Sequence, residues 1–415
     1  MLPAAKAGPG GAEPLVALFT ATSAVCVTGL SPVNFATYWS PLGEAIILIL
    51  IQVGGLGIMT GATVLSLLVT RKLRLSSRLL AQAETPSLSP GDMLVVLKLV
   101  IAATLLIEAL VAAALTLHLW VLRDEPLASA LWHGVFHAVS SFTNAGFSNY
   151  DEGLGAFAGD VLFLTPICLA VIAGGLGFPV IHELLREPTP RTWSLHTRLT
   201  LVATAALLVV GALCMGMLEW GAPATLGPLE PGDRALNAFF FSAMARNAGL
   251  NTIDISALQP ETLGLTKVLM MIGGGSASTA GGIKVTTFVI LGLVVWAEIR
   301  GEADVTAFRR RISSDVQRQA VSVALLSIGV VCAAALILMI LTPHDLEASL
   351  FEAVSAFTTT GLSLGVTETL PPAGQVVIIL LMFVGRIGTI TFATALALQS
   401  RRRPFRYPEE RPIVG

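Results

Sequence analysis

Charged residues are scarce in this chain: Asp, Glu, Lys and Arg make up only 13% of its 415 residues, whereas 54% are hydrophobic. An ordinary soluble domain carries about 25% charged residues. The mean hydropathy of +0.78 adds to the contrast. The longest polar link between apolar runs has only about twenty residues, so no soluble domain is expected. The composition therefore excludes a typical soluble enzyme and indicates a polytopic membrane protein.

Cysteine and histidine are also few. The four cysteines have apolar neighbours and form no CxxC pair, which favours buried free thiols over disulfides or a thiolate metal site: Cys26, Cys168, Cys214 and Cys332. His118, His133 and His137 show no ligand spacing, so a membrane metalloenzyme is disfavoured. We expect no catalytic residues, no cofactor in this chain and no metal other than a transported cation. The polar, Gly/Pro-rich start shows no signal peptide.

One short stretch recurs four times. It reads FTATSAVCVTGL at 19–30, HAVSSFTNAGF at 137–147, FSAMARNAGL at 241–250 and EAVSAFTTTGL at 352–362. Its glycines, Gly29, Gly146, Gly249 and Gly361, are separated by 117, 103 and 112 residues. A period this long does not suit a solenoid. It predicts four copies of one membrane module around a common axis.

Each copy is predicted to contain an outer helix, a re-entrant pore helix, a filter strand and an inner helix. The apolar run before each glycine is about 10–14 residues long, which is too short to span a bilayer. The fold class is thus an all-α membrane protein with parallel repeats around a central cation pore. The copies are 1–70, 71–190, 191–300 and 301–400, followed by a basic tail at 401–415.

Seven full spans are predicted, one of them broken. They are Glu44–Val69, Met93–Leu122, Val161–Leu185, Thr197–Leu218, the broken segment Glu261–Trp296, Val321–Leu341 and Gly374–Leu398. No apolar segment precedes the first recurrence, so we expect the first outer helix to be missing.

Four basic stretches hold 17 of the 25 lysines and arginines: Arg71–Arg78, Arg186–Arg198, Arg300–Arg318 and Arg401–Arg411. By the positive-inside rule they lie on the cytoplasmic side. Since each follows an inner helix, the repeats are parallel.

The filter strands offer backbone carbonyls. Glycine reaches the dihedral angles that turn carbonyls towards an axis, and rings of carbonyls can replace the water shell of a cation. The side chains are small and uncharged, which favours a large monovalent cation over Ca²⁺. The alternative is that these glycines only allow close helix packing. The candidate filter residues are Val27, Thr28, Gly29, Asn144, Ala145, Gly146, Asn247, Ala248, Gly249, Thr359, Thr360 and Gly361.

Acidic residues follow two of the glycines by five positions, namely Asp151 and Asp254. They predict either an acidic outer mouth that concentrates cations or carboxylates that cap a turn. Asn34 and Val366 occupy the same place in the first and fourth copies.

The inner helices carry a second recurring feature. Gly54, Gly174, Gly273 and Gly385 follow the filter glycines by 25, 28, 24 and 24 residues. Arg386 stands in this segment of copy four. A charge inside a span should face the cavity. Arg386 is therefore interpreted as a barrier to cations below the filter or as an anchor for backbone carbonyls, and both roles can hold.

The segment GGGSASTAGG interrupts the inner helix of copy three. Its glycines disfavour a helix, and it lacks the pattern of a phosphate-binding loop. We expect an unwound loop that closes the path in one state and retracts in another. Lys284 beyond it is read as a sensor or as a snorkelling anchor. The gate residues are Gly273, Gly274, Gly275, Ser276, Ala277, Ser278, Thr279, Ala280, Gly281, Gly282 and Arg386.

Two further deep charges have open roles. Glu108 either pairs with a neighbour or binds an ion. Arg246, just before the third filter glycine, either braces the filter strands or tunes the charge of the mouth.

The filter strings VTGL, TNAGF, RNAGL and TTGL, together with GGGSASTAGGIK and VGRIG, resemble the Trk/Ktr/HKT superfamily of potassium transporters, in particular its Ktr-type membrane subunits. The resemblance covers about Leu15 to Gln399. It implies a K⁺-conducting homodimer with one pore per subunit, the loop 273–282 as an intramembrane gate, and Arg386 as the family's pore arginine. It also implies Na⁺-stimulated uptake and a cytosolic ring of KtrA-type nucleotide-binding subunits. Gly29 stands where Na⁺-selective plant relatives have Ser, which predicts K⁺ selectivity.

A gated cation pathway is thus the leading interpretation. A secondary transporter with alternating access is the alternative, but it usually shows inverted repeats and paired broken helices.

Overall fold

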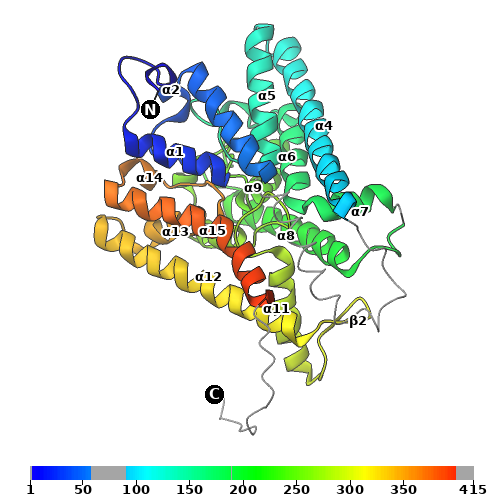
Figure 1. Ribbon diagram of the computed structural model, residues 1–415. Coiled ribbons are helices and arrows are strands. Elements are labelled where there is room, and N and C mark those ends of the chain that lie inside the picture. Colours follow the sequence, from blue (N-terminus) through cyan, green and yellow to red (C-terminus); the bar gives the residue numbers. More distant parts are fainter. Residues whose placement is uncertain (1, 58–89, 188, 399–415) are drawn as a thin grey trace.

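The computed structural model describes residues 2–57, 90–187 and 189–398. The basic stretches at 71–78 and 401–411, and the end of the first inner helix, lie outside them. Within the described residues the secondary structure is mostly helical, with one short two-stranded sheet (Figure 1).

The elements follow the four predicted copies. Copy one contains η1 (Pro3–Ala5), α1 (Pro14–Cys26), α2 (Phe35–Tyr38) and the apolar helix Pro41–Gly57. Copy two contains α4 (Pro90–Leu122), α5 (Leu127–Thr143), η2 (Gly155–Phe157), α6 (Val161–Leu176) and α7 (Phe178–Arg186). Copy three contains α8 (Leu195–Glu219), α9 (Pro231–Ala245), η3 (Ile255–Ala257), α10 (Pro260–Met271) and α11 (Val285–Arg300). Copy four contains α12 (Ser314–Leu341), α13 (Leu346–Thr358), α14 (Val366–Thr369) and α15 (Pro372–Leu398).

Three helices in the described part are long and apolar enough to cross a membrane alone: Lys98–Leu122 within α4, the whole of α8 and the whole of α12. These are the outer helices of copies two, three and four. In Figure 1, α4 and α5 stand on the opposite side of the molecule from α12 and α13.

A short helix directly precedes each recurring glycine, as the apolar runs predict. These are α1, α5, α9 and α13, with 13, 17, 15 and 13 residues. Local signals start them: Pro14 and Pro231 stand in the first turn, and the Asp345 carboxylate accepts the Ala348 N–H.

The inner helix of copy two is not continuous, so the prediction of a single span over Val161–Leu185 is wrong. α6 and α7 meet at an angle of 99°. Gly177 at the break has φ +88°, and a Cβ there would lie 2.7 Å from the Ser276 carbonyl oxygen. The chain bends where the backbone of copy three approaches it, so the described part of the chain contains two interrupted inner helices instead of the one predicted.

The basic link after α11 contains a small antiparallel hairpin that the helical interpretation did not include. Strand β1 (Thr306–Ala307) pairs with β2 (Arg310–Arg311). Phe308 and Arg309 at the turn both have positive φ, as a two-residue hairpin requires.

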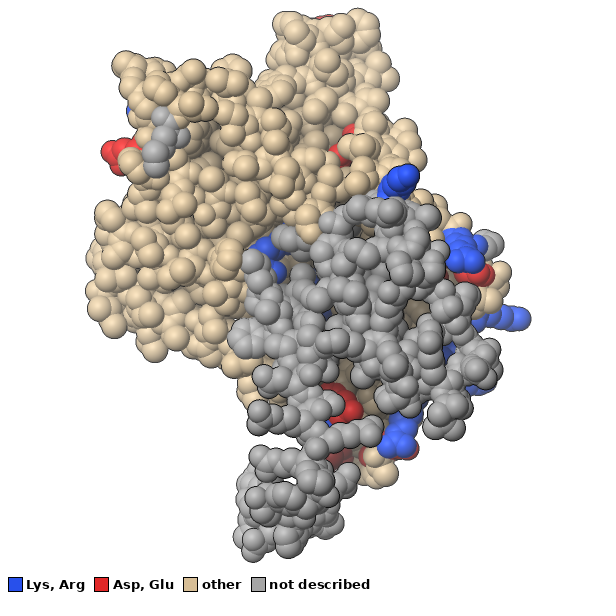
Figure 2. Space-filling model, in the orientation of Figure 1, with Lys and Arg blue, Asp and Glu red and all other residues tan. Residues whose placement is uncertain are grey.

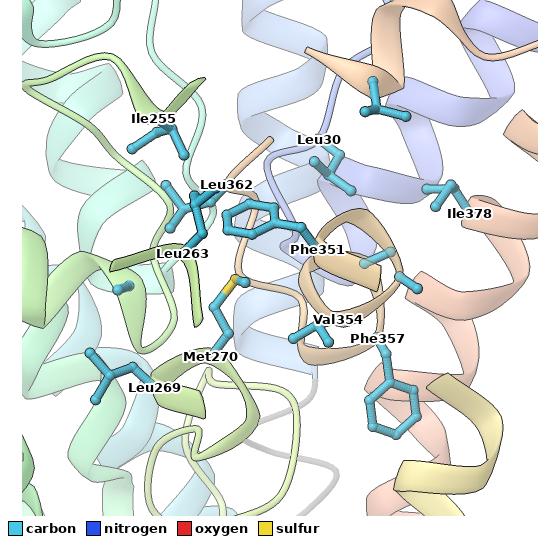
Figure 3. Packing of buried hydrophobic residues seen from close by; sticks show 14 of the residues in the cluster. Leu30, Ile255, Leu263, Leu269, Met270, Phe351, Val354, Phe357, Leu362 and Ile378 are labelled. Carbon is cyan, nitrogen blue, oxygen red and sulfur yellow. The ribbon is translucent and has the colours of Figure 1, made fainter. Parts of the chain in front are cut away.

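The main apolar cluster joins copies one, three and four. Figure 3 shows Phe351 of α13 among Leu30, Leu362 and Met270. Leu30 and Leu362 each follow a recurring glycine directly. The cluster therefore packs the segments after these glycines against a pore helix.

A polar tie holds α4 to α6 at their facing ends. Asp160 caps α6, and its carboxylate lies 2.8 Å from both His118 Nε2 and Arg123 Nη2. Burial raises the pKa of the Asp160 carboxyl, but the hydrogen bonds from Arg123 and His118 outweigh it and leave the pKa below its usual value.

Charge is unevenly distributed over the face seen in Figure 2. Its Lys and Arg side chains gather at the end where α11 and β2 lie, and most of the remaining visible surface is uncharged. This pattern suits a body surrounded by lipid with one basic end.

Candidate functional site

Three of the pore helices end in the same turn. Val27, Asn144 and Thr359 follow α1, α5 and α13 with φ of 55°, 61° and 52°. In each turn, the N–H of this residue donates to the carbonyl three residues back, and the next N–H donates five residues back, as Thr28 does to Ser23 at 2.8 Å. This is the Schellman arrangement, and it normally uses Gly in the left-handed position. A β-branched Val or Thr there is strained, which marks the turn as a place held by its surroundings.

The third copy ends its pore helix differently. Arg246 after α9 keeps a helical conformation, with φ of −75°. The N–H groups of Asn247, Ala248 and Gly249 all approach the carbonyl of Met244, at 3.1, 3.0 and 3.1 Å. The four copies are thus only quasi-equivalent.

The four glycines form a closed ring. All have positive φ, between 62° and 92°. A Cβ on Gly29 would lie 2.5 Å from the Ala145 carbonyl oxygen, and one on Gly146 would lie 2.5 Å from that of Ala248. A Cβ on Gly249 would lie 2.2 Å from the Thr360 oxygen, and one on Gly361 would lie 2.2 Å from that of Thr28. Each glycine therefore abuts the carbonyl just before the glycine of the next copy, in the cyclic order one, two, three, four.

Three inner-helix glycines pack against the pore helix of their own copy. A Cβ on Gly54, Gly174 or Gly385 would lie 2.1, 1.9 or 1.7 Å from a backbone oxygen. These oxygens belong to Val25, Phe142 and Phe357, each four residues before the filter glycine of its copy. At these positions glycine serves close helix packing. Gly273 breaks the pattern, because its Cβ would meet the Gly281 oxygen at 2.2 Å instead.

The segment 273–282 is an ordered loop between α10 and α11. Its ends approach each other, since Gly273 N donates to Ile283 O at 2.9 Å. Ser278 Oγ donates to Gly275 O at 2.6 Å, and Ala277 and Gly282 take positive φ of 57° and 67°. The loop also bonds to the bend of copy two, where Gly275 N donates to Gly175 O at 2.7 Å.

The loop lies directly against the ends of three pore helices. Thr279 Oγ1 is 2.7 Å from the side-chain amide of Asn144 in copy two. Gly281 N donates to Asn247 Oδ1 of copy three at 3.2 Å. A Cβ on Gly281 would lie 2.5 Å from the Thr358 carbonyl oxygen of copy four. The candidate gate is thus brought into contact with the candidate filter.

Arg386 lies in α15 with only 3% of its surface exposed. Its Nη1 donates to the Thr279 carbonyl. Its Nε and Nη2 are buried and have no hydrogen-bond partner among the described residues. The guanidinium therefore holds the loop through Thr279, and its positive charge is buried without a carboxylate among the described residues.

Two other cations also bind loop carbonyls. Arg246 Nη2 donates to Gly273 O at 3.1 Å, so Arg246 contacts the base of the loop instead of a carboxylate. Lys284 Nζ donates to Ala280 O within the loop. All three side chains stabilise one loop conformation.

Of the two acids beyond the filter glycines, Asp254 has a local role in the structure. The Asp254 carboxylate accepts the Ser256 N–H at 2.9 Å and caps η3, as Asn34 caps α2. Asp151 is exposed in a turn. Glu108 has a partner that the sequence did not reveal, because Gln52 Nε2 donates to its Oε2 at 2.9 Å.

Two buried polar residues of the pore helices were not anticipated. His137 and Glu352 are completely buried, and each stands nine residues before its filter glycine. The sequence already indicated them, since each is the first residue of its copy of the recurring stretch and is polar in an otherwise small and apolar run.

Comparisons with known proteins concern the family and the fold of the chain. A family model described as TrkH, a cation transport protein, matches residues 11–403. The Ktr system potassium uptake protein B of Bacillus subtilis is 36% identical over 399 residues, which cover 96% of this chain and 89% of that protein. The protein of the same name from Vibrio alginolyticus is 34% identical over 408 residues, with 96% and 88% covered.

The potassium/sodium uptake protein NtpJ of Enterococcus hirae is 35% identical over 407 residues, with 96% and 89% covered. Among solved structures, the potassium transporter TrkH from Vibrio parahaemolyticus matches with a TM-score of 0.72 at 18% identity. That match covers 94% of this chain and 79% of the TrkH chain. The structural likeness concerns the fold. Together these matches confirm the resemblance that the filter and loop motifs predict.

Proposed function

Because this chain belongs to the TrkH family of cation transport proteins, we propose that it takes up potassium ions across the cell membrane through a carbonyl-lined filter. The observation that carries the proposal is the closed ring of Gly29, Gly146, Gly249 and Gly361. Four strands that meet at one axis offer main-chain oxygens from four sides. Such oxygens can replace the hydration shell of a monovalent cation.

The gate in this proposal is the loop 273–282 together with Arg386. The contacts of Thr279 and Gly281 with the pore-helix ends support this role, because a loop at that position would lie beside the proposed path. Arg386 has two functions here. It holds the loop through the Thr279 carbonyl, and its buried charge opposes the entry of a cation while the loop is closed. Retraction of the loop would remove both obstacles.

Regulation is proposed to come from outside this chain. The described links between the helices are short, and the chain offers basic segments on one side. We propose that these segments face the cytoplasm and contact a ring of KtrA-type nucleotide-binding subunits, that two copies of this chain form a homodimer, and that Na⁺ stimulates uptake. The names of the Bacillus and Vibrio relatives, which refer to a Ktr system, support a partner of this type.

Rubidium flux into proteoliposomes tests the proposal. The purified chain is reconstituted alone and with the candidate nucleotide-binding partner, each with and without Na⁺. We expect Rb⁺ uptake that K⁺ outside inhibits by competition and that Na⁺ outside does not inhibit. The partner with its opening nucleotide should raise the rate, and Na⁺ should raise it further.

Each part of the proposal can fail separately. Equal inhibition by K⁺ and Na⁺ would contradict a potassium filter. Rates that ignore the partner would contradict external regulation but leave the filter intact. Uptake that requires an opposing or accompanying ion in fixed ratio would favour a secondary transporter.

A further inference from the structure

The four walls of the glycine ring differ in how they are held. The cyclic order of the contacts places copy one opposite copy three and copy two opposite copy four. In copies two and four, the chain beyond the glycine is hydrogen-bonded to buried polar side chains of its own pore helix. In copy three, Thr252 Oγ1 donates to Oδ1 of the buried Asn237 of α9, twelve residues before Gly249, and copy one has no such bond among the described residues. Among the described residues, a tie from the position nine residues before the glycine therefore occurs only in copies two and four, which are opposite walls.

In copy four the bond partner is a buried carboxylate. Glu352 of α13 has no exposed surface. Its Oε1 accepts from Ser363 Oγ and, at 3.1 Å, from Leu364 N. Its Oε2 accepts from Thr367 Oγ1 at 2.8 Å. One carboxylate thus holds the segment 363–367, which starts two residues after Gly361.

In copy two the same position carries an imidazole. His137 Nδ1 lies 2.9 Å from the His133 carbonyl oxygen, which can only accept, so Nδ1 carries the proton. Nε2 is then an acceptor, and it lies 3.1 Å from Ser148 Oγ. Ser148 stands two residues after Gly146, as Ser363 does after Gly361. The serine hydroxyl also accepts the Tyr150 N–H at 3.2 Å, which fixes the outgoing turn.

A second position repeats the pattern six residues before the glycine. Ser140 Oγ donates to the Phe147 carbonyl at 2.7 Å in copy two. In copy four, Ser355 Oγ accepts from Gly361 N at 3.1 Å. Both braced walls therefore have two tie points, at matched positions of the pore helix.

The other two walls have none at these positions. In copy one, Thr20 and Ser23 occupy them, and their buried hydroxyls have no hydrogen-bond partner among the described residues. In copy three, Phe240 and Ala243 occupy them and carry no polar group. Among the described residues, ties at these two positions are thus confined to two opposite copies, and copy three is tied instead through Asn237 and Thr252.

We propose that His137 and Glu352 are positioning residues that hold two opposite walls of the filter at the width suited to potassium, an inference that rests on the proposed function. A smaller ion such as Na⁺ is well coordinated only if the carbonyls move inward. The ties resist this movement because buried hydrogen-bonding groups are costly to leave without partners. Phe351 and Leu362, which flank Glu352 and Ser363, pack in one apolar cluster and keep water away (Figure 3).

Serine variants test the ties with little risk to folding. Ser363→Ala removes one tie in copy four, and Ser148→Ala removes one in copy two. Glu352→Gln weakens all ties of copy four. We expect the ratio of Rb⁺ to Na⁺ uptake to fall about fivefold for each serine variant and more than tenfold for Glu352→Gln. Ser363→Thr keeps a hydroxyl and should restore the ratio.

The matched controls are Thr20→Val and Ser23→Ala in copy one, whose hydroxyls bind nothing in the described residues. They should leave the ratio unchanged. In the double variant Glu352→Gln/Ser363→Ala, the ratio of Rb⁺ to Na⁺ uptake should fall by less than the product of the two single effects, since both substitutions act on the same hydrogen bond. Size-exclusion profiles in detergent report folding, and the serine variants decide the matter if Glu352→Gln does not fold.

Gly146→Ala serves as the reference for the filter itself. If Gly146→Ala alters the ratio of Rb⁺ to Na⁺ uptake while Ser363→Ala and Ser148→Ala do not, the proposed role of His137 and Glu352 is wrong, and the proposed filter is still supported. If Gly146→Ala also leaves selectivity unchanged, the proposed function fails. Equal effects of Thr20→Val and Ser363→Ala on the uptake ratio would also contradict the proposed role of Glu352, because they would show that selectivity is sensitive to any substitution in the pore helices.

Discussion

The side chains of Asn144 and Thr279 meet at 2.7 Å, although 135 residues separate them in the sequence. Asn144 ends the pore helix of copy two, and Thr279 lies in the loop of copy three. With the amide turned so that its oxygen accepts from Thr279 Oγ1, the same oxygen is 3.3 Å from Gly175 N and the amide nitrogen reaches the Ser141 and Val171 carbonyls. The contact couples the candidate filter and the candidate gate directly.

Removing this contact should release the loop in part. Thr279→Val keeps the shape of the side chain but leaves the Asn144 amide short of one bond, which costs about 1 kcal/mol or more. We expect rubidium flux without the regulatory partner to rise about fivefold. Ser276→Ala is the control, since its hydroxyl contacts Thr286 at 3.1 Å and not the filter. A Thr279→Val flux equal to that of the control would contradict the coupling.

Arg386 should restrain flux through both its bond and its charge. Arg386→Ala removes both, and a lost hydrogen bond from a charged group corresponds to about 1.5 kcal/mol or more. Rubidium flux should therefore rise at least roughly tenfold. Arg386→Gln keeps an N–H donor for the Thr279 carbonyl, so the rubidium flux should rise less in this variant than in Arg386→Ala. If Gln and Ala give the same increase, the charge alone is the barrier; an unchanged flux in folded Arg386→Ala would refute both roles.

A methyl group on a ring glycine should disturb the filter. In Gly146→Ala the new Cβ would lie 2.5 Å from the Ala248 carbonyl oxygen, on a residue with φ of +72°. We expect the ratio of Rb⁺ to Na⁺ uptake to fall about tenfold, because backbone strain of this kind costs about 1–3 kcal/mol. Gly292→Ala is the control, because its Cβ would meet no atom within 4 Å. Retained selectivity in Gly146→Ala would remove the basis for a carbonyl filter at this ring.

The inner-helix glycines should matter for stability more than for selectivity. Gly174→Ala would place a Cβ 1.9 Å from the Phe142 carbonyl oxygen, so α6 and α5 must separate. Overpacking of this kind costs about 1–3 kcal/mol, and the midpoint of thermal unfolding in detergent should fall. Gly264→Ala in α10 has open space and should leave the midpoint unchanged or raise it slightly. A Gly174→Ala midpoint equal to that of wild type would show that the two helices do not need this close approach.

Acid should weaken the tie between α4 and α6. The pKa of Asp160 is lowered in the folded state from a usual value of 3.8, so its ionised form stabilises the fold above that value. This stability is lost as the pH falls through the lowered pKa, because the neutral acid no longer attracts Arg123. Asp160→Asn should therefore be less stable than wild type at neutral pH, and the difference should shrink below about pH 4. Thermal midpoints of both proteins across this range provide the measurement, and a difference independent of pH would show that the charge is not involved.

Part of the site follows from sequence spacing because its physics is local. Gly29 and Gly361 were recognisable because a short apolar run and a glycine recur in matched contexts. The segment 273–282 was recognisable because ten small residues cannot form a stable helix in the middle of a span. The expected continuous helix over Val161–Leu185 was wrong, because Gly177 looks like an ordinary glycine of a membrane helix until the Ser276 backbone lies against it.

The chain alone determined the number of copies, the short helices before the glycines and the interrupted helix, since each depends on length, hydropathy and local propensity. Only the tertiary structure decided the order of the copies around the axis and the partners of Arg386, Glu108 and Glu352. It also showed that two opposite walls are tied to their pore helices through His137 and Glu352, at the same position of the repeat. These features depend on contacts between residues far apart in the chain, and a periodic pattern of residue types does not specify which of them meet.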